Sequence, residues 1–213
     1  MSRSQGLLLS FEGIDASGKK TQSLMLFKWL RSIGMQAEYL SFPDYNTIIG
    51  GEIRAFLSGK KNYSLEARHM LYSVNRYEHK EQIEDWLRDK RIIVVNRYCE
   101  SNVAYGTAAG LSLEWLEELE GRMPKSDYVF FLDITPDVSK DRKPRRDKFE
   151  ADSEYLARVS SVYRALSERR NWFKVDAANT IDTLHYEVKS ITQHLLKENK
   201  LSDTALPVSG QGV

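Results

Sequence analysis

Cysteine, proline and long apolar runs are all scarce in this chain of 213 residues. Its only cysteine, Cys99, cannot form an internal disulfide, which excludes a disulfide-stapled secreted scaffold and favours a reducing compartment. No apolar stretch approaches the roughly 18 to 20 residues that a membrane span requires, and the amino terminus shows no signal-peptide cleavage pattern. We therefore expect a cytoplasmic protein with no membrane partner.

An excess of either charge is also lacking. The formal net charge is +1, which gives the whole molecule no attraction to nucleic acid or to an anionic membrane. The four histidines and the single cysteine show no metal-ligand spacing. Any basic binding site must therefore be local, and we expect no nucleic-acid partner.

Short apolar runs alternate with long amphipathic stretches along the chain. Runs rich in β-branched and aromatic residues, typical of buried parallel strands, cover residues 7–13, 37–42, 91–97, 127–134 and 171–177. The periodicity predicts helices over residues 19–32, 49–57, 64–87, 100–108, 112–121, 150–170 and 181–198. This repeated βα pattern predicts one α/β domain over residues 1–199, followed by a loose tail over residues 200–213.

A phosphate-binding loop follows the first strand-like run. The stretch GIDASGKKT matches the pattern G-x-x-x-x-G-K-[ST] at Gly13, Gly18 and Lys19, but Lys20 stands where a hydroxyl is expected. Backbone N–H groups of residues 15–19 and the amino terminus of the next helix would bind phosphate, with Lys19 supplying a full positive charge. The absence of a guanine-recognition motif favours ATP chemistry. The predicted ATP-binding residues are Gly13, Ala16, Ser17, Gly18, Lys19, Lys20 and Thr21.

Arginines are placed where phosphates would bind. Phe42 and Arg97 follow strand-like runs, so both should lie at the carboxyl edge of a parallel sheet, where such sheets bind ligands. Basic residues also crowd the segment KDRKPRRDKFE, residues 140–150, which includes Arg142, Arg145 and Arg146. Such a segment is either a solvated loop or a lid whose arginines close on phosphate.

The order of these motifs resembles that of thymidylate kinases. FEGIDxSGKxTQ, FP, LYSVNR, xRYxxSxxAY and DKFE follow one another between about Leu7 and Ala178. The resemblance implies a P-loop fold with a five-stranded parallel sheet flanked by helices and an arginine-rich lid, usually in a homodimer. It also implies Mg²⁺-assisted transfer of the γ-phosphoryl group of ATP to dTMP.

The resemblance also implies roles for individual residues. Asp15 would bind the sugar 3′-hydroxyl, Tyr72 would stack on thymine, and Arg97 would grip the acceptor phosphate. The predicted dTMP-binding set is Asp15, Phe42, Tyr72, Arg76, Arg97, Ser101 and Tyr105, in which Tyr105 disfavours a 2′-hydroxyl. The predicted catalytic set is Lys19, Arg97, Arg142, Arg145 and Arg146. No general base is needed, because the acceptor is already an anionic phosphate.

The sequence departs from the family pattern at five positions. Lys20 replaces the metal-binding Ser or Thr, Asn96 replaces an Asp, Tyr45 replaces a phosphate-binding Arg, Gly106 replaces a Gln or Thr, and Ala16 replaces a Gly or Arg. No residue is therefore a confident direct Mg²⁺ ligand, and Asp15 or Asp133 would act through water. These losses leave two alternatives open: a deoxynucleoside monophosphate kinase of relaxed base specificity, and a nucleotide-binding paralogue without turnover.

Overall fold

The structure is a computed structural model that describes residues 6–142, 153–169, 172–199 and 201. Strands form one five-stranded parallel sheet in the order β2-β3-β1-β4-β5. The strands are β1 (Leu7–Glu12), β2 (Ala37–Ser41), β3 (Ile92–Asn96), β4 (Tyr128–Asp133) and β5 (Phe173–Asp176). The predicted fold class is thus confirmed, since β-branched and aromatic runs of this length become buried strands.

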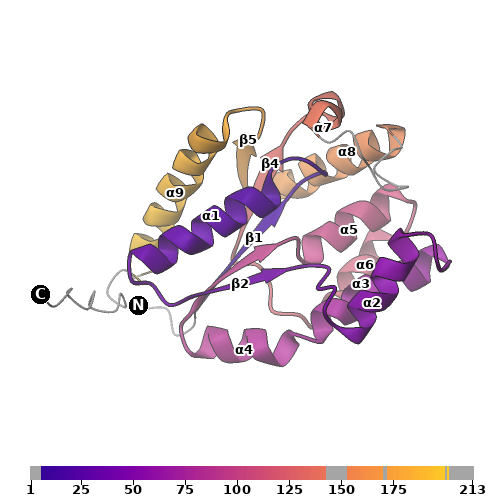
Figure 1. Cartoon of the computed structure of the whole chain (residues 1–213), viewed down its shortest axis with the longest axis horizontal. Helices are drawn as coiled ribbons and strands as arrows, with labels where there is room; N and C mark the ends of the chain where they lie inside the picture. Colours follow the sequence, from indigo (N-terminus) through magenta and orange to yellow (C-terminus); the bar gives the residue numbers. More distant parts are fainter. Residues whose placement is uncertain (1–5, 143–152, 170–171, 200, 202–213) are drawn as a thin grey trace, which may run out of the picture.

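Helices cover both faces of this sheet (Figure 1). α1 (Lys19–Ser32) and α9 (Ile181–Glu198) pack on the face that carries Leu9 and Phe11. α4 (Lys80–Arg88) packs on the opposite face against Leu8, and α8 (Ser153–Arg169) lies on that same face, where Tyr163 stacks on Phe131. The remaining helices are α2 (Ile48–Leu57), α3 (Leu65–Tyr77), α5 (Cys99–Ala108), α6 (Leu113–Leu119) and α7 (Pro136–Arg142).

Two helix predictions need correction. The predicted helix over residues 64–87 is broken into α3 and α4 at His79, whose Nε2 lies 3.1 Å from Oδ2 of Asp44 and whose ring packs edge-on against Phe42. α7 was not predicted, because residues 140–142 were assigned to the basic loop. Its start nevertheless carries an ordinary signal, proline at the first helical position after a threonine whose hydroxyl accepts a hydrogen bond from the amide of Val138.

The carboxyl edge of the sheet is where the candidate residues meet. The chain passes from β3 to β4 across the central strand β1, so the strand order reverses beside the loop that follows β1. Parallel sheets bind ligands outside such a reversal. The predicted tail lies outside the described residues except for Leu201, which is buried in the core.

Among the described residues, no helix is long and apolar enough to cross a membrane.

Candidate active site

The phosphate loop has the backbone that its glycines permit. Gly13 has φ 137°, and a Cβ there would stand 2.5 Å from the carbonyl oxygen of Leu132. Gly18, with φ 93°, caps the amino terminus of α1. Because the left-handed region suits glycine, the loop turns sharply and leads directly into the positive end of the α1 dipole.

Lys19 lies inside the turn of this loop. Its side chain is buried, and Nζ donates to the carbonyl oxygen of Ile14 at 2.6 Å and to Oγ of Ser17 at 3.3 Å. Lys20 and Thr21, in contrast, are exposed in the first turn of α1. The predicted phosphate-binding lysine is therefore held at the loop, whereas its neighbour extends toward solvent.

A cavity of about 570 Å³ adjoins the loop. Its lining includes every residue of the predicted dTMP-binding set, which comes from five separate parts of the chain: Asp15, Phe42, Tyr72, Arg76, Arg97, Ser101 and Tyr105. A volume of this order suits a nucleotide-sized ligand. The fold thus brings these residues together around one space.

Arg97 is held firmly at the cavity wall. Its guanidinium forms an ion pair with Asp15 and lies over the ring of Tyr105, 5.3 Å from the centroid. Burial is the largest single influence and lowers the pKa of Arg97, but the combined effect of Asp15, Tyr105, Tyr163 and Glu12 raises it, and the pKa lies well above its usual value. Burial and Asp15 both raise the pKa of Tyr105, whose hydroxyl donates to Asp15 at 3.2 Å. The arginine stays charged and the phenol stays neutral.

Arg76 forms a buried ion pair at another part of the wall. Nε donates to Oε2 of Glu120 at 3.1 Å, and Nη2 bonds Oε1 of the same carboxylate. Asn102 donates to Glu120 at 2.7 Å and bonds Nδ1 of His69 at 2.7 Å. Burial lowers the pKa of His69 to about 4, so its ring is neutral at physiological pH.

Several site residues were missed at the sequence level. Arg68, His69, Asn102, Tyr155 and Arg158 also line the cavity. The helical spacing of His69, Tyr72 and Arg76 could have identified His69, because residues three and four apart share a helix face. Tyr155 and Arg158 lie on α8, far along the chain, and the sequence carries no local signal that brings them here.

Glu12 was also overlooked. It ends β1 with a fully buried side chain. Its carboxylate accepts hydrogen bonds from the amide of Tyr98 at 2.6 Å, from Ser101 Oγ at 2.5 Å and from Tyr163 OH at 2.9 Å. Burial raises its pKa above the usual value against the opposing effect of these donors. Its position at the end of an apolar strand run is the feature of the sequence that could have identified Glu12 as a buried carboxylate.

Two family departures have packing explanations. A Cβ at Gly106 would stand 2.7 Å from Cδ1 of Leu116 and 3.1 Å from Cε1 of His69, so a larger residue here would have to displace these side chains, and the close approach of α6 favours glycine. The ring of Tyr45 lines the cavity and packs under Arg54, whose guanidinium is 5.1 Å from the ring centroid.

The positions that hold Mg²⁺ in other phosphate loops are altered. Asn96 donates through Nδ2 to Ser41 at 2.8 Å, while its buried Oδ1 accepts no hydrogen bond from the described residues. Asp133 pairs with Arg164 and Lys174, both at 3.0 Å. Over the same described ranges, no group of three or more His, Cys, Asp or Glu side chains forms a metal site.

The three arginines predicted to form a lid divide between described and undescribed parts of the chain. Arg142 ends α7 and donates to the carbonyl oxygen of Ala178 at 3.3 Å, so it does not line the substrate cavity in this structure. Arg145 and Arg146 lie outside the described residues. α7 itself touches the phosphate loop, because Ser139 Oγ donates to the carbonyl oxygen of Asp15 at 2.7 Å.

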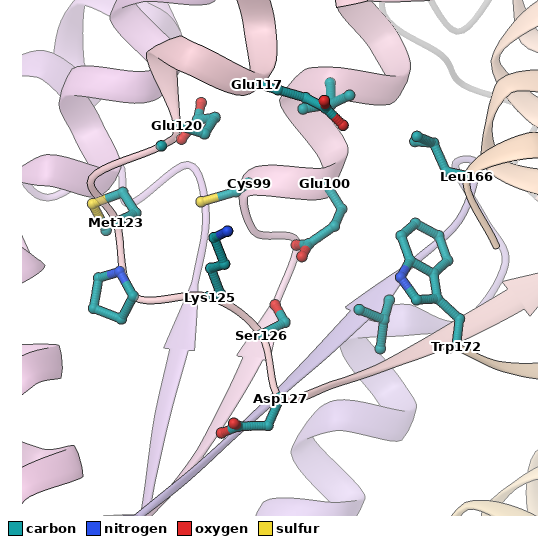
Figure 2. Close-up of a pocket in the computed structure, with 14 residues that line it drawn as sticks. Cys99, Glu100, Glu117, Glu120, Met123, Lys125, Ser126, Asp127, Leu166 and Trp172 are labelled. Carbon is teal, nitrogen blue, oxygen red and sulfur yellow. The ribbon is translucent and has the colours of Figure 1, made fainter. Parts of the chain in front are cut away.

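A second cavity, of about 350 Å³, lies on the other side of α5 (Figure 2). Figure 2 shows Glu100, Glu117 and Asp127 around it, with Trp172 as an aromatic wall. Among the described lining residues Lys125 is the one lysine or arginine. This acidic space does not suit phosphates, whereas the cavity beside the loop contains four arginines, Arg68, Arg76, Arg97 and Arg158.

A glycine loop at a helix amino terminus, a buried lysine within it and a neighbouring cavity lined with arginines define a P-loop nucleotide kinase. The comparisons with known proteins narrow this class. The sequence profile of the family described as "Thymidylate kinase" matches residues 11–188. The chain therefore belongs to the thymidylate kinase family.

Individual relatives agree with this assignment. A thymidylate kinase of Danio rerio is 33% identical over 199 residues, covering 92% of this chain and 94% of that protein. One of Homo sapiens is 30% identical over 200 residues, with the same two shares, 92% and 94%. A solved thymidylate kinase from Candida albicans, described as revealing the origin of broad substrate specificity, matches with a TM-score of 0.79 and 27% identity over 93% of this chain and 94% of that one. The predicted family and the predicted enzyme class, nucleoside monophosphate kinase, are confirmed.

Proposed function

We propose that this chain transfers the γ-phosphoryl group of ATP to dTMP, giving ADP and dTDP. Family membership supports the reaction. The observation that carries it to this chain is the position of Asp15, which lies within the phosphate loop and also lines the acceptor cavity, paired with Arg97. One residue thus joins the donor and acceptor sites, as direct transfer between two bound nucleotides requires.

The donor phosphates would bind at the loop. The backbone amides of residues 15–19 and the α1 dipole supply partial positive charge. Lys19 would exchange its present bonds to Ile14 and Ser17 for phosphate oxygens. Arg145 and Arg146 as lid arginines stay predictions, since they lie outside the described residues, and Arg142 would have to leave Ala178 to join them.

The acceptor would occupy the cavity with its phosphate at Arg97 and its base between Tyr72 and Arg76. Arg76 has two of its donor nitrogens engaged by Glu120, which fixes the guanidinium plane at the wall. Tyr105 would lie beneath the sugar, and Asp15 would accept from the 3′-hydroxyl. Catalysis then consists of alignment and positive charge, with no proton to remove from the acceptor phosphate.

Mg²⁺ is the proposed cofactor, and it would arrive with ATP. When bound, it would supply positive charge that neutralises the transferring phosphates. No hydroxyl stands at position 20, so this chain's contribution is outer-sphere: Asn96 Oδ1 and Asp15 would accept hydrogen bonds from waters that the ion retains. Both predicted carboxylates are already engaged, Asp133 by Arg164 and Lys174 and Asp15 by Arg97 and Tyr105. Asp15 is the better placed of the two, because it lines the cavity beside the phosphate loop and Asp133 does not.

An acceptor-dependent assay tests the proposal. ADP release from ATP and Mg²⁺ should require dTMP, and Lys19→Ala should lower kcat by on the order of 100-fold or more. Lys28→Ala, an exposed lysine on the same helix, is the matched control and should leave the rate unchanged. Parallel reactions with dUMP, dCMP and UMP separate a dTMP enzyme from one of relaxed specificity. Binding of ATP without turnover of any acceptor would instead favour the non-catalytic alternative.

The homodimer and the cytoplasmic location stay predictions. Exposed apolar side chains of α2 and α3, namely Ile48, Met70 and Val74, are the candidate contact between two copies. Met70→Glu should then convert the dimer into a monomer in light scattering, whereas the same substitution at Ile181 on α9 should not.

A further inference from the structure

Glu12 is a buried carboxylate for which the proposed reaction has no use. Its side chain is fully buried, and among the described residues it does not line the substrate cavity. A buried carboxylate is costly unless donors surround it. Its donors come from the backbone after Arg97, from α5 and from α8.

The backbone leaves the sheet at Arg97. The last paired residues of β1 and β3 are Phe11 and Asn96. Arg97 then adopts φ 60°, a left-handed conformation that non-glycine residues rarely adopt, and its amide donates to the carbonyl oxygen of Phe11 at 3.1 Å. Such a backbone persists only where its surroundings hold it.

Glu12 holds the kinked backbone in place through a hydrogen bond at Tyr98, the residue after Arg97. Oε1 accepts the amide of Tyr98 at 2.6 Å, so a side chain takes over where the strand ladder ends. Oε2 accepts Ser101 Oγ at 2.5 Å and Tyr163 OH at 2.9 Å, which tie the first turn of α5 and the helix α8 to the same carboxylate. The amides of residues 97 and 98 are thus both anchored to β1, on either side of the kink.

We infer that Glu12 is a positioning residue, whose carboxylate holds the kinked backbone at Arg97 and so fixes the Arg97 guanidinium where the acceptor phosphate binds. The inference rests on the proposed function, because only an acceptor that carries a phosphate uses Arg97. A purely structural role would affect the affinities for dTMP and for thymidine equally, whereas a positioning role affects mainly the affinity for dTMP. Losing the carboxylate weakens binding of the phosphorylated nucleoside far more than binding of the unphosphorylated one.

Calorimetric titration of dTMP and of thymidine measures this difference. Glu12→Ala should raise the Kd for dTMP by on the order of 10- to 100-fold, the effect of a displaced binding group, and raise the Kd for thymidine much less, through the contacts of Ser101 and Asp15 alone. Glu12→Gln should keep most of the dTMP affinity, because the amide oxygen still accepts from Tyr98 and the two hydroxyls can rotate to accept from the amide nitrogen.

A matched variant and a double-mutant cycle sharpen the test. Tyr163→Phe removes one bond to Glu12 but leaves the amide of Tyr98 bound, so it should not change the ratio of the two Kd values. In an Arg97→Ala background, Glu12→Ala should cause no further change in that ratio. Equal weakening of dTMP and thymidine, or a full additional loss in the Arg97→Ala background, would overturn the inference.

Folding is measured alongside by thermal unfolding. If Glu12→Ala is not obtained folded, Glu12→Asp withdraws the carboxylate by one methylene and should show the same phosphate-selective loss. A wild-type protein that binds dTMP without phosphorylating it would overturn the proposed function. Normal wild-type turnover with an unchanged ratio in the Glu12 variants would overturn only the role of Glu12.

Discussion

Replacing Lys20 by threonine should lower the concentration of Mg²⁺ that the enzyme needs. Lys20 is exposed in the first turn of α1, and that turn contains no acidic residue. Threonine restores the hydroxyl that phosphate loops use as a metal ligand. The change thus removes a repulsion and adds a ligand at once.

The position of Lys20 sets the size of the repulsion. A unit charge about 4 Å from a divalent ion, at an effective dielectric of 20, would be repelled by about 8 kcal/mol, which no metal site would tolerate. An exposed side chain can extend into water instead. At about 8 Å and a dielectric near 80 the repulsion is about 1 kcal/mol, equivalent to about a fivefold change in metal affinity.

Initial rates of ADP formation are measured against free Mg²⁺ at fixed ATP and saturating dTMP. Lys20→Met removes the charge alone and should lower the half-saturating concentration about fivefold. Lys20→Thr should lower it further, and Lys28→Met should leave it unchanged. An unchanged midpoint in Lys20→Thr, or full wild-type activity in excess chelator, would refute this reasoning.

Four other outcomes are expected. Arg97→Ala should raise the KM for dTMP and lower kcat/KM by about 2 kcal/mol or more, roughly 30-fold, since it removes a charge-assisted bond; an unchanged KM would exclude Arg97 from the acceptor site. Tyr105→Ala should bring kcat/KM for UMP closer to that for dUMP, and an unaltered ratio would remove Tyr105 from sugar selection. Gly106→Ala should destabilise the protein by about 1 to 3 kcal/mol through overpacking against α6, whereas Gly51→Ala, with open space around it, should not lower the melting temperature. The pKa of buried His69 is lowered to about 4, so below pH 6.5 the unfolded state binds more protons than the folded state. The free energy of unfolding should therefore fall by up to about 1.4 kcal/mol per pH unit as the pH drops toward 4. In urea titrations at several pH values, His69→Gln should lose this part of the pH dependence.

The sheet was predictable because its strands are short runs of β-branched and aromatic residues, and all five of these runs became strands. The position of the site at the carboxyl edge of the sheet was also predictable, because parallel strands bring the phosphate loop, Phe42 and Arg97 to the same edge. The acceptor set came from the family resemblance, and those residues do line one cavity.

What escaped prediction depends on contacts between distant segments. The break at His79 is associated with its contacts to Asp44 and Phe42, which periodicity in the helix cannot reveal. Glu120 is an ordinary surface-type residue in the sequence, yet it neutralises Arg76 in the core. Gly106 departs from the family pattern in the sequence, and only the approach of Leu116 in the fold supplies a packing reason. Only burial distinguishes such residues from solvated ones.

Transfer of label from the γ-phosphate of ATP to dTMP tests the central claim most directly. We expect labelled dTDP to form in step with ADP, to depend on dTMP and Mg²⁺, and to be lost in Lys19→Ala but kept in Lys28→Ala. ADP formation without labelled dTDP, or nucleotide binding with no transfer to any acceptor, would contradict the assignment of this chain as a dTMP-phosphorylating enzyme.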